Sequence, residues 1–215
     1  VYVMEEPLAA AIGGGLSVAE PSGSLVVDIG GGTTEIAVVS LGGIVLAESV
    51  RVGGRHLDEA IQRHMRLRHD LLIGSVTAEE MKIEVARAAP EPGLHAEVRG
   101  RSALSGLPRG VVVNGEEIAG AIDEPLRRIL AAVRRSLERT PPELLSDVMD
   151  AGLLLTGGGA LLPGLDERLR SDLGVPVHVA SGSLLAVARG AGMALEEMRA
   201  IRRAGAAREW SFTSR

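Results

Sequence analysis

The sequence predicts an α/β domain in which helices cover a central sheet, and three observations support this fold class. Residues 25–29 and 36–39 are short apolar runs rich in β-branched residues, as in strands buried on both faces. A third apolar run, 153–155, also ends in a glycine turn and is followed by a helical pattern. Strands that alternate with crossover helices build layered α/β domains, and such domains bind ligands at the carboxyl ends of their strands.

The other elements are predicted from local signals taken in chain order. Pro7 suits the first turn of a helix, because a residue there needs no N–H donor. Thr77 with Glu80 and Asn114 with Glu117 are typical helix starts, and Pro125 predicts a break between two helices. The predicted strands are 1–4, 25–29, 36–39, 43–50, 96–99, 110–113, 153–156 and 177–179. The predicted helices are 7–12, 57–68, 77–88, one on either side of Pro125, one from Pro142, 165–173 and 184–198.

Composition narrows the functional class. The chain has 215 residues, of which 46% are hydrophobic but only 1% aromatic, so the core must be aliphatic. The net charge of −5 and the lack of aromatic stacking residues argue against nucleic-acid binding. The chain has no cysteine, no signal peptide is visible, and no apolar run approaches the roughly 20 residues of a transmembrane helix. We therefore expect a cytoplasmic protein without a transmembrane segment.

Two glycine turns carry the strongest chemical signal. The first is Gly30–Thr34, with three glycines and two threonines. Glycines let backbone N–H groups approach an anion closely, and threonine hydroxyls can donate to phosphate oxygens. Asp28 ends an otherwise apolar strand, where a bare carboxylate is costly, and a hydrated Mg²⁺ carrying phosphates would be a suitable partner. The second turn, Gly157–Gly159, repeats this arrangement far along the chain.

Together these motifs resemble the MreB family, the bacterial actin homologues that determine rod shape, in the C-terminal part of the family's sequence. The most specific blocks are 24–40 (SLVVDIGGGTTEIAVVS) and 155–159 (LTGGG). The remaining matching blocks, in family order up to about residue 198, are 5–13, 40–45, 51–54, 57–61, 72–74, 77–79, 82–84, 98–101 and 140–144.

The resemblance implies the actin-like ATPase (ribonuclease H-like) fold, in which two α/β lobes clamp a nucleotide between paired glycine turns. We expect the second lobe and parts of the first. The implied division is 1–16 as a remnant of the first lobe, 17–74 and 114–180 as the second-lobe core, 75–113 as a small inserted subdomain, 181–199 as a C-terminal helix packing toward the first lobe, and 200–215 as a tail. Three explanations for the missing first lobe stay open: a cut sequence, a misplaced start, or a naturally short paralogue.

The resemblance also implies the site, with ATP and Mg²⁺ as cofactors. Glu6 would position or activate the attacking water, Thr33 would lie beside that water, and Asp28 would lie near the metal. The implied nucleotide contacts are Gly30, Gly31, Gly32, Thr33, Thr34, Glu79, Lys82, Gly157, Gly158, Gly159 and Ala160. Simpler interpretations stand beside these roles. Glu6 could pair with a helix dipole, Thr33 could be an ordinary turn residue, and Glu79 with Lys82 could be a surface ion pair.

The implied function is that of an ATP-binding cytoskeletal protein that forms or joins filaments governing bacterial cell shape. Its partners would be itself or a full-length homologue, and cell-wall elongation proteins at the inner face of the membrane. Whether it hydrolyses ATP weakly stays open. The alternatives are a non-catalytic filament partner and a small-molecule kinase of the same superfamily. The kinase lacks support because no further carboxylate is available to bind a substrate.

Two sets of residues fall outside this interpretation. Arg55 stands where the family usually carries an acidic residue, and the family's Arg-Gly-Arg-Asp pattern is altered after Arg101. The five histidines show no spacing typical of a metal site, so they are expected to be surface or packing residues. They are His56, His64, His69, His95 and His178.

Overall fold

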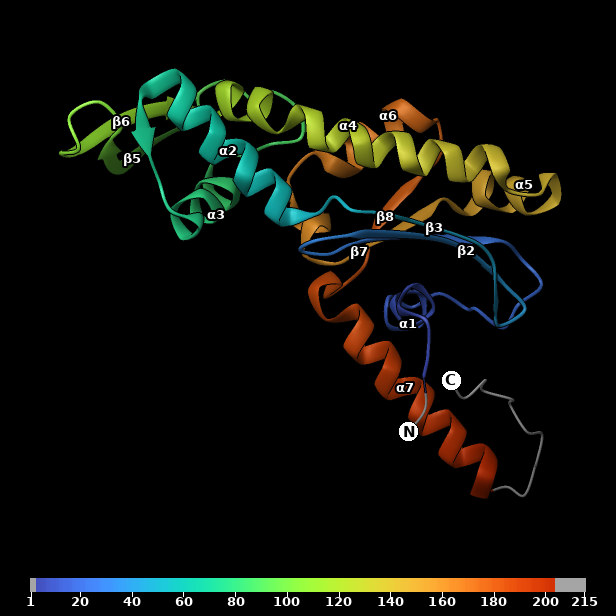
Figure 1. Ribbon diagram of the computed structural model, residues 1–215. Helices are drawn as coiled ribbons and strands as arrows, with labels where there is room; N and C mark the ends of the chain where they lie inside the picture. The colour runs from blue at the N-terminus through green and yellow to red at the C-terminus, as the bar shows by residue number, and fades with distance from the viewer. Residues whose placement is uncertain (1–2, 204–215) are drawn as a thin grey trace.

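The computed structural model describes residues 3–203 and has a central five-stranded sheet with helices on both faces (Figure 1). The strand order is β3-β2-β1-β7-β8. The strands are β1 (Ser24–Ile29), β2 (Thr34–Ser40), β3 (Gly43–Val50), β7 (Leu153–Thr156) and β8 (Val177–Val179). β1, β2 and β3 form an antiparallel meander, whereas β7 and β8 run parallel to β1. The ends of β1 and β7 therefore lie at the same edge of the sheet.

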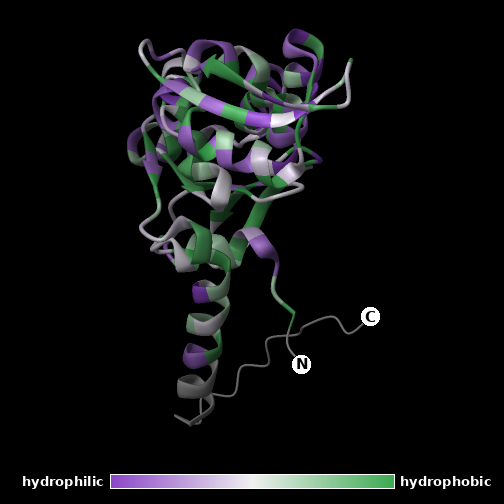
Figure 2. Cartoon of the chain, turned by 90° about the vertical axis from the view of Figure 1, so that its left-hand side faces the viewer, coloured by the Kyte–Doolittle hydropathy of each residue, from purple (hydrophilic) through white to green (hydrophobic). Residues whose placement is uncertain are grey.

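Helices cover the sheet on both sides, as the apolar strand sequences predict (Figure 1). One face packs against the larger hydrophobic cluster, which includes residues of five α-helices. These helices are α2 (Gly54–His69), α3 (Ser75–Glu84), α4 (Gly115–Arg139), α5 (Pro142–Ala151) and α6 (Leu165–Leu173). The other face packs mainly against α1 (Glu6–Gly13), with α7 (Ala186–Arg203) next to it. Figure 2 shows hydrophobic residues concentrated in the middle of the molecule, where the sheet lies.

The segment between β4 and β6 forms a second, smaller sheet beside the main one (Figure 1). It contains β4 (Leu71–Leu72), α3 (Ser75–Glu84), β5 (His95–Ser102) and β6 (Pro108–Asn114), with β5 central. The β5–β6 hairpin agrees with the predicted strands. β4 is a two-residue strand that the sequence pattern did not indicate, and its Leu71 is completely buried.

Three predictions for individual elements were wrong. α4 continues through Pro125, because Ile122 and Leu126 on either side are buried in the core and this packing outweighs the lost hydrogen bond. α3 begins after Gly74 rather than at Thr77, and no side chain caps it. Val3 and Met4 are not in a strand, and the first two residues of that predicted strand lie outside the described part of the chain. Asn114 does cap α4, since its Oδ1 accepts a 2.8 Å hydrogen bond from the N–H of Glu117.

α1 and α7 cross with their backbones in close contact. A Cβ atom on Gly13 would lie 1.8 Å from the carbonyl oxygen of Ala186, and one on Gly190 would lie 1.8 Å from that of Ala9. Only glycine leaves room for such a crossing, so these two positions fix how α7 is attached. Of the predicted tail from residue 200, the part from 204 onward lies outside the described residues, while α7 itself extends to Arg203.

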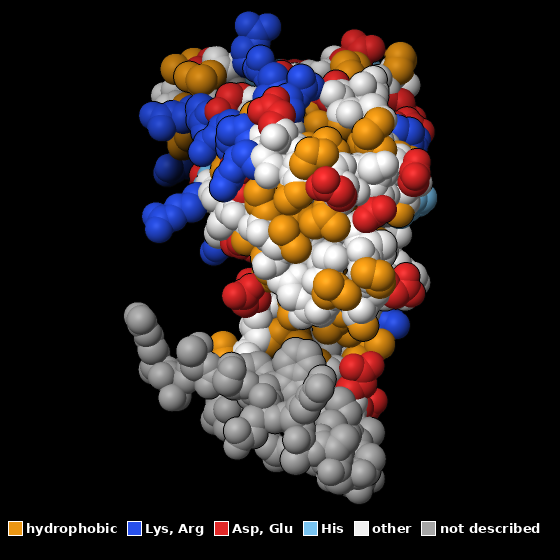
Figure 3. Space-filling view, turned by 90° about the vertical axis from the view of Figure 1, so that its right-hand side faces the viewer, with side chains coloured by type: hydrophobic (Ala, Val, Ile, Leu, Met, Phe, Trp, Pro, Cys, Tyr) orange, Lys and Arg blue, Asp and Glu red, His pale blue; other side chains and the backbone are white. Residues whose placement is uncertain are grey.

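The surface carries a mixture of charged and apolar groups. Figure 3 shows Lys and Arg side chains gathered toward one side of the face that carries α5 and the C-terminal end of α4. Several arginines of α4 form ion pairs, such as Arg135 with Glu48 at 2.6 Å. Among the residues that the structure describes, none of the helices is long and apolar enough to cross a bilayer.

Candidate functional site

The two glycine turns face one cleft. β1 and β7 are parallel neighbours in which Asp28 lies opposite Thr156, so the turn after each strand emerges at the same edge of the sheet. The cleft has a volume of ≈ 650 Å³. It is lined by Glu6, Asp28, Gly30, Gly31, Gly54, Arg55, Leu57, Asp58, Glu79, Lys82, Ile83, Gly157, Gly158, Gly159, Leu161, Leu162, Pro163, Ser183, Leu184 and Val187.

The two turns pack directly against each other through their glycines. Gly157 has a φ of +81°, and a Cβ atom there would lie 2.4 Å from the carbonyl oxygen of Ile29. A Cβ atom on Gly159 would lie 2.2 Å from Cγ2 of the same isoleucine. Any larger residue would push the turns apart, so glycine is required here for the close approach of the two strand ends.

The backbone N–H groups of the turns divide into two sets. Gly30 donates to the carbonyl oxygen of Thr33 at 2.9 Å, and Gly157 donates to that of Ser183 at 3.0 Å, so these two N–H groups hold the turns in shape. The N–H groups of Gly31 and Gly32 have no hydrogen-bond partner among the described residues. Unpaired N–H groups beside a cleft are suited to an anion such as phosphate.

The carboxyl groups of Glu6 and Asp28 line the cleft, and the charge of Glu35 acts on both. Asp28 is 4% exposed, and its Oδ1 accepts a 2.7 Å hydrogen bond from Oγ1 of Thr156. Burial raises the pKa of Asp28, and the charge of Glu35 adds to this effect, although the hydrogen bond from Thr156 opposes it. The pKa of Glu6 is raised by burial and by the charges of Asp28 and Glu35. A cation would relieve this repulsion, so the donor set fits a hard divalent ion such as Mg²⁺.

Lys82 reaches the cleft from α3 and pairs with Asp58, not with Glu79 as in the simpler interpretation of the sequence. Its Nζ lies 2.8 Å from Oδ1 of Asp58 and 3.4 Å from the carbonyl oxygen of Gly54. Both Lys82 and Glu79 line the cleft. Sequence reasoning missed Asp58 as a site residue. The available signal was a carboxylate on the apolar side of α2, between the buried Leu57 and Ile61.

Two more residues contribute to the cleft without having been predicted as part of it. The guanidinium of Arg55 lies against the first glycine turn, because a Cβ atom on Gly32 would be 2.6 Å from Nη2 of Arg55. Ser183 is 2% exposed, and its hydroxyl has no hydrogen-bond partner among the described residues. Both groups could contact a polar ligand.

Some predicted contact residues do not line the cleft. Thr34 is completely buried, and its Oγ1 donates to the carbonyl oxygen of Val52 at 2.8 Å. Ala160 is buried within the short 3₁₀ helix η1 (Gly158–Leu161), behind the second turn. Gly32 and Thr33 belong to the first turn but are not among the lining residues. The roles predicted for these four residues stay predictions.

This sheet order, with two glycine turns facing one cleft, defines the chain as a protein of the actin-like ATPase fold. The model of the MreB/Mbl protein family matches residues 1–203. The cell shape-determining protein MreB of Escherichia coli (strain K12) is 53% identical over 197 residues, which are 91% of this chain and 57% of that protein. Mbl of Bacillus subtilis (strain 168) is 48% identical over 200 residues, which are 92% of this chain and 60% of that protein. The chain belongs to the MreB/Mbl family, as its motifs predicted.

Solved structures agree with this assignment. MreB5 of Spiroplasma citri bound to ADP superposes with a TM-score of 0.88 at 34% identity, covering 91% of this chain and 60% of that one. The same protein bound to AMPPNP gives a TM-score of 0.89 and covers 94% of this chain and 61% of that one. The chain thus spans about three fifths of the length of these relatives. The predicted fold class is confirmed.

Proposed function

We propose that the cleft binds ATP together with Mg²⁺ and that the chain is the second lobe, with parts of the first, of an actin-type filament protein governing bacterial cell shape. The observation that carries this proposal is the shared cleft between the two glycine turns, with Asp28 at its edge. The proposal is supported by MreB5 structures bound to ADP and AMPPNP. It is also supported by relatives described as cell shape-determining proteins.

The proposal gives a role to each of the following groups in or beside the cleft. The free N–H groups of Gly31 and Gly32 bind phosphate oxygens, and Asp28 holds the hydrated Mg²⁺ that carries those phosphates. Glu6 orients the attacking water, with Thr33 beside it. Catalysis of this kind depends mostly on positioning and electrostatics, so one carboxylate and one hydroxyl are sufficient. Glu79 and Lys82 contact the nucleoside.

The proposed partners are further copies of the chain or a full-length homologue, assembled into filaments. Both the filament and the proposed contact with cell-wall elongation proteins at the inner face of the membrane rest on membership of the MreB/Mbl family, whose relatives are described as cell shape-determining proteins. The proposed location is therefore cytoplasmic.

Calorimetric titration of ATP with Mg²⁺ tests the binding step. The blocking variant is Gly158→Val, because a Cβ atom at Gly158 meets only Cδ1 of Leu184, at 3.3 Å, and its φ is not in the left-handed region. The added side chain should occupy the cleft and weaken ATP binding about tenfold or more while the protein stays folded. The matched control is Gly120→Ala, at an open position on α4. Equal ATP affinity in the wild type and Gly158→Val would contradict the proposal.

Sedimentation with ATP and Mg²⁺ tests assembly separately. We expect the wild-type chain to pellet with nucleotide, alone or together with a full-length homologue, and Gly158→Val to stay in the supernatant. A chain that binds ATP but stays monomeric under both conditions would refute the filament role and leave the nucleotide site standing.

A further inference from the structure

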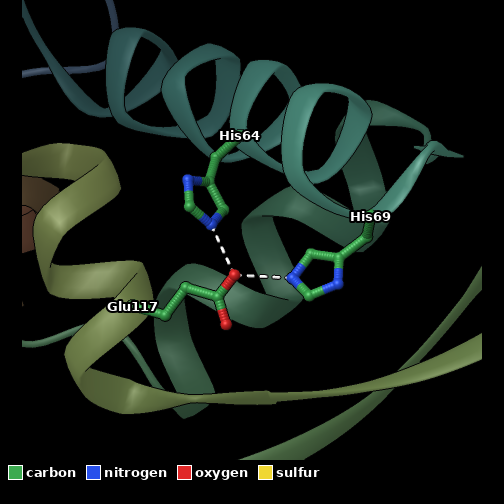
Figure 4. A group of neighbouring side chains, drawn as sticks. All are labelled: His64, His69 and Glu117. Atoms are coloured by element: carbon green, nitrogen blue, oxygen red, sulfur yellow. Dashed lines mark hydrogen bonds and ion pairs between the residues drawn. The ribbon is translucent and has the colours of Figure 1, made fainter.

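Two histidines and a glutamate meet outside the cleft, at the junction of α2 and α4 (Figure 4). Nε2 of His64 lies 2.6 Å from Oε1 of Glu117, and Nε2 of His69 lies 2.5 Å from the same oxygen. His64 and His69 are on α2, and Glu117 is in the first turn of α4. The sequence pattern, which indicated surface or packing residues, did not predict this cluster.

The donor set is that of a transition-metal site. Imidazole nitrogen and carboxylate oxygen are ligands of Zn²⁺, and the three donor atoms lie within 4.8 Å of one another. Bonds of about 2.0–2.1 Å in a tetrahedral site place ligand atoms about 3.3–3.5 Å apart. Oε1 of Glu117 must therefore withdraw from each ring nitrogen by less than about 1 Å for an ion to enter.

The surroundings permit this adjustment. The three side chains are 19–22% exposed, so they are neither locked in the core nor fully solvated. They line a hollow of ≈ 700 Å³ together with Arg68, Asn114, Glu116 and Gly120. The hollow gives an ion access and leaves room for water as a fourth ligand. The cap formed by Asn114 fixes the backbone of Glu117.

We propose that His64, His69 and Glu117 bind a divalent ion of the zinc class. None of the three lines the nucleotide cleft, so this site is independent of the proposed function. α2 is followed by β4, and β6 is followed by α4, so both connections between the main sheet and the smaller sheet pass next to this cluster. An ion bound there would link these two connections. Its effect is to hold the two sheets in a fixed relative orientation.

Zinc titration of the untagged, chelator-treated chain without nucleotide tests the proposal. We expect one Zn²⁺ per chain, bound about tenfold or more weakly in His64→Gln and in His69→Gln. His95→Gln and His178→Gln remove exposed histidines outside the cluster and serve as matched controls, with unchanged binding expected. Mg²⁺ should not compete, because it prefers oxygen ligands. Equal zinc affinity in the wild type and His64→Gln would overturn the proposal.

A second measurement distinguishes loss of zinc binding from loss of folding in the variants. Binding to the folded state alone raises the melting temperature, so Zn²⁺ should raise that of the wild type and of His95→Gln but not that of His64→Gln. Replacing zinc by Co²⁺ gives intense visible absorption when the ion is tetrahedral. A wild-type chain without a zinc-dependent rise in melting temperature, or with the weak spectrum of hydrated Co²⁺, would identify the cluster as an ion pair only.

Discussion

Thr156 donates a 2.7 Å hydrogen bond from its Oγ1 to Oδ1 of Asp28, although 128 residues separate the two in the chain. They are also register partners at the ends of the parallel strands β7 and β1. The bond therefore joins the two glycine turns at their bases and holds the Asp28 carboxylate at the edge of the cleft.

Asp28→Asn should stabilise the chain in the absence of ligand at neutral pH. The amide keeps an oxygen that can accept from Thr156 and removes a charge whose burial is unfavourable. The raised pKa of Asp28 means that the folded state binds its proton more tightly than the unfolded state does. The charged Asp28 therefore lowers the folding stability of the wild type by its full amount at pH values above the folded pKa. This loss of stability disappears at pH values below the ordinary pKa of 3.8.

Urea unfolding of both proteins at a series of pH values checks this prediction. The advantage of Asp28→Asn should shrink as the pH falls through the folded pKa of Asp28. The same variant should bind ATP with Mg²⁺ more weakly, because a neutral amide is a poor partner for the ion. A wild type that is more stable than the variant at neutral pH would show that burial is not the dominant effect.

Gly157→Ala should lower the free energy of unfolding by about 3 kcal/mol, from overpacking and from strain in a positive-φ extended conformation that is almost exclusive to glycine. The overpacking arises because the added Cβ atom would lie 2.4 Å from the carbonyl oxygen of Ile29, and the strain arises from the φ of +81°. Gly174→Ala is the control, since its φ is +72° but nothing lies within 4 Å of the added atom. It should cost only the strain, about 1–2 kcal/mol. Equal costs in denaturant unfolding would remove the steric part of the argument.

Local signals made much of the fold predictable from the sequence. The strands beside Gly30 and Gly157 are apolar runs that end in glycine, and the Asn114 cap is a sequence motif. Elements that depend on packing were not predictable in this way. Pro125 stays inside α4, and the short β4 forms only because β5 pairs with it.

The same distinction applies to the residues of the site. Asp28 and the glycines could be predicted from the sequence because they lie at or directly after the ends of apolar strands. Asp58 could not, since its partner Lys82 lies 24 residues away on another helix. The cluster of His64, His69 and Glu117 was missed because its members are five and 48 residues apart, and neither separation is a familiar ligand spacing.

Gly190→Ala should weaken the attachment of α7 to α1. Its added methyl group would lie 1.8 Å from the carbonyl oxygen of Ala9, so the helices must separate, at a cost of about 1–3 kcal/mol. Gly192→Ala, on the same helix but in open space, should instead stabilise the chain by about 0.5–1 kcal/mol. Hydrogen exchange of α1 amides checks both, with faster exchange expected only in Gly190→Ala. Unchanged α1 exchange in that variant would contradict the close crossing.

Arg55→Ala should weaken ATP binding about tenfold, because a charge-assisted hydrogen bond to phosphate contributes about 1.5–3 kcal/mol. Arg55 lines the cleft, and its guanidinium lies against Gly32 of the first glycine turn, where the phosphates are proposed to bind. Arg51→Ala removes the same charge from an exposed position outside the cleft, so it separates direct contact from a change in net charge. Calorimetric titrations of ATP and of AMP into each variant give the comparison. If Arg55 contacts the outer phosphates, its loss weakens ATP much more than AMP, and Arg51→Ala leaves both affinities nearly unchanged. Equal losses in the two variants would show that only the overall charge matters.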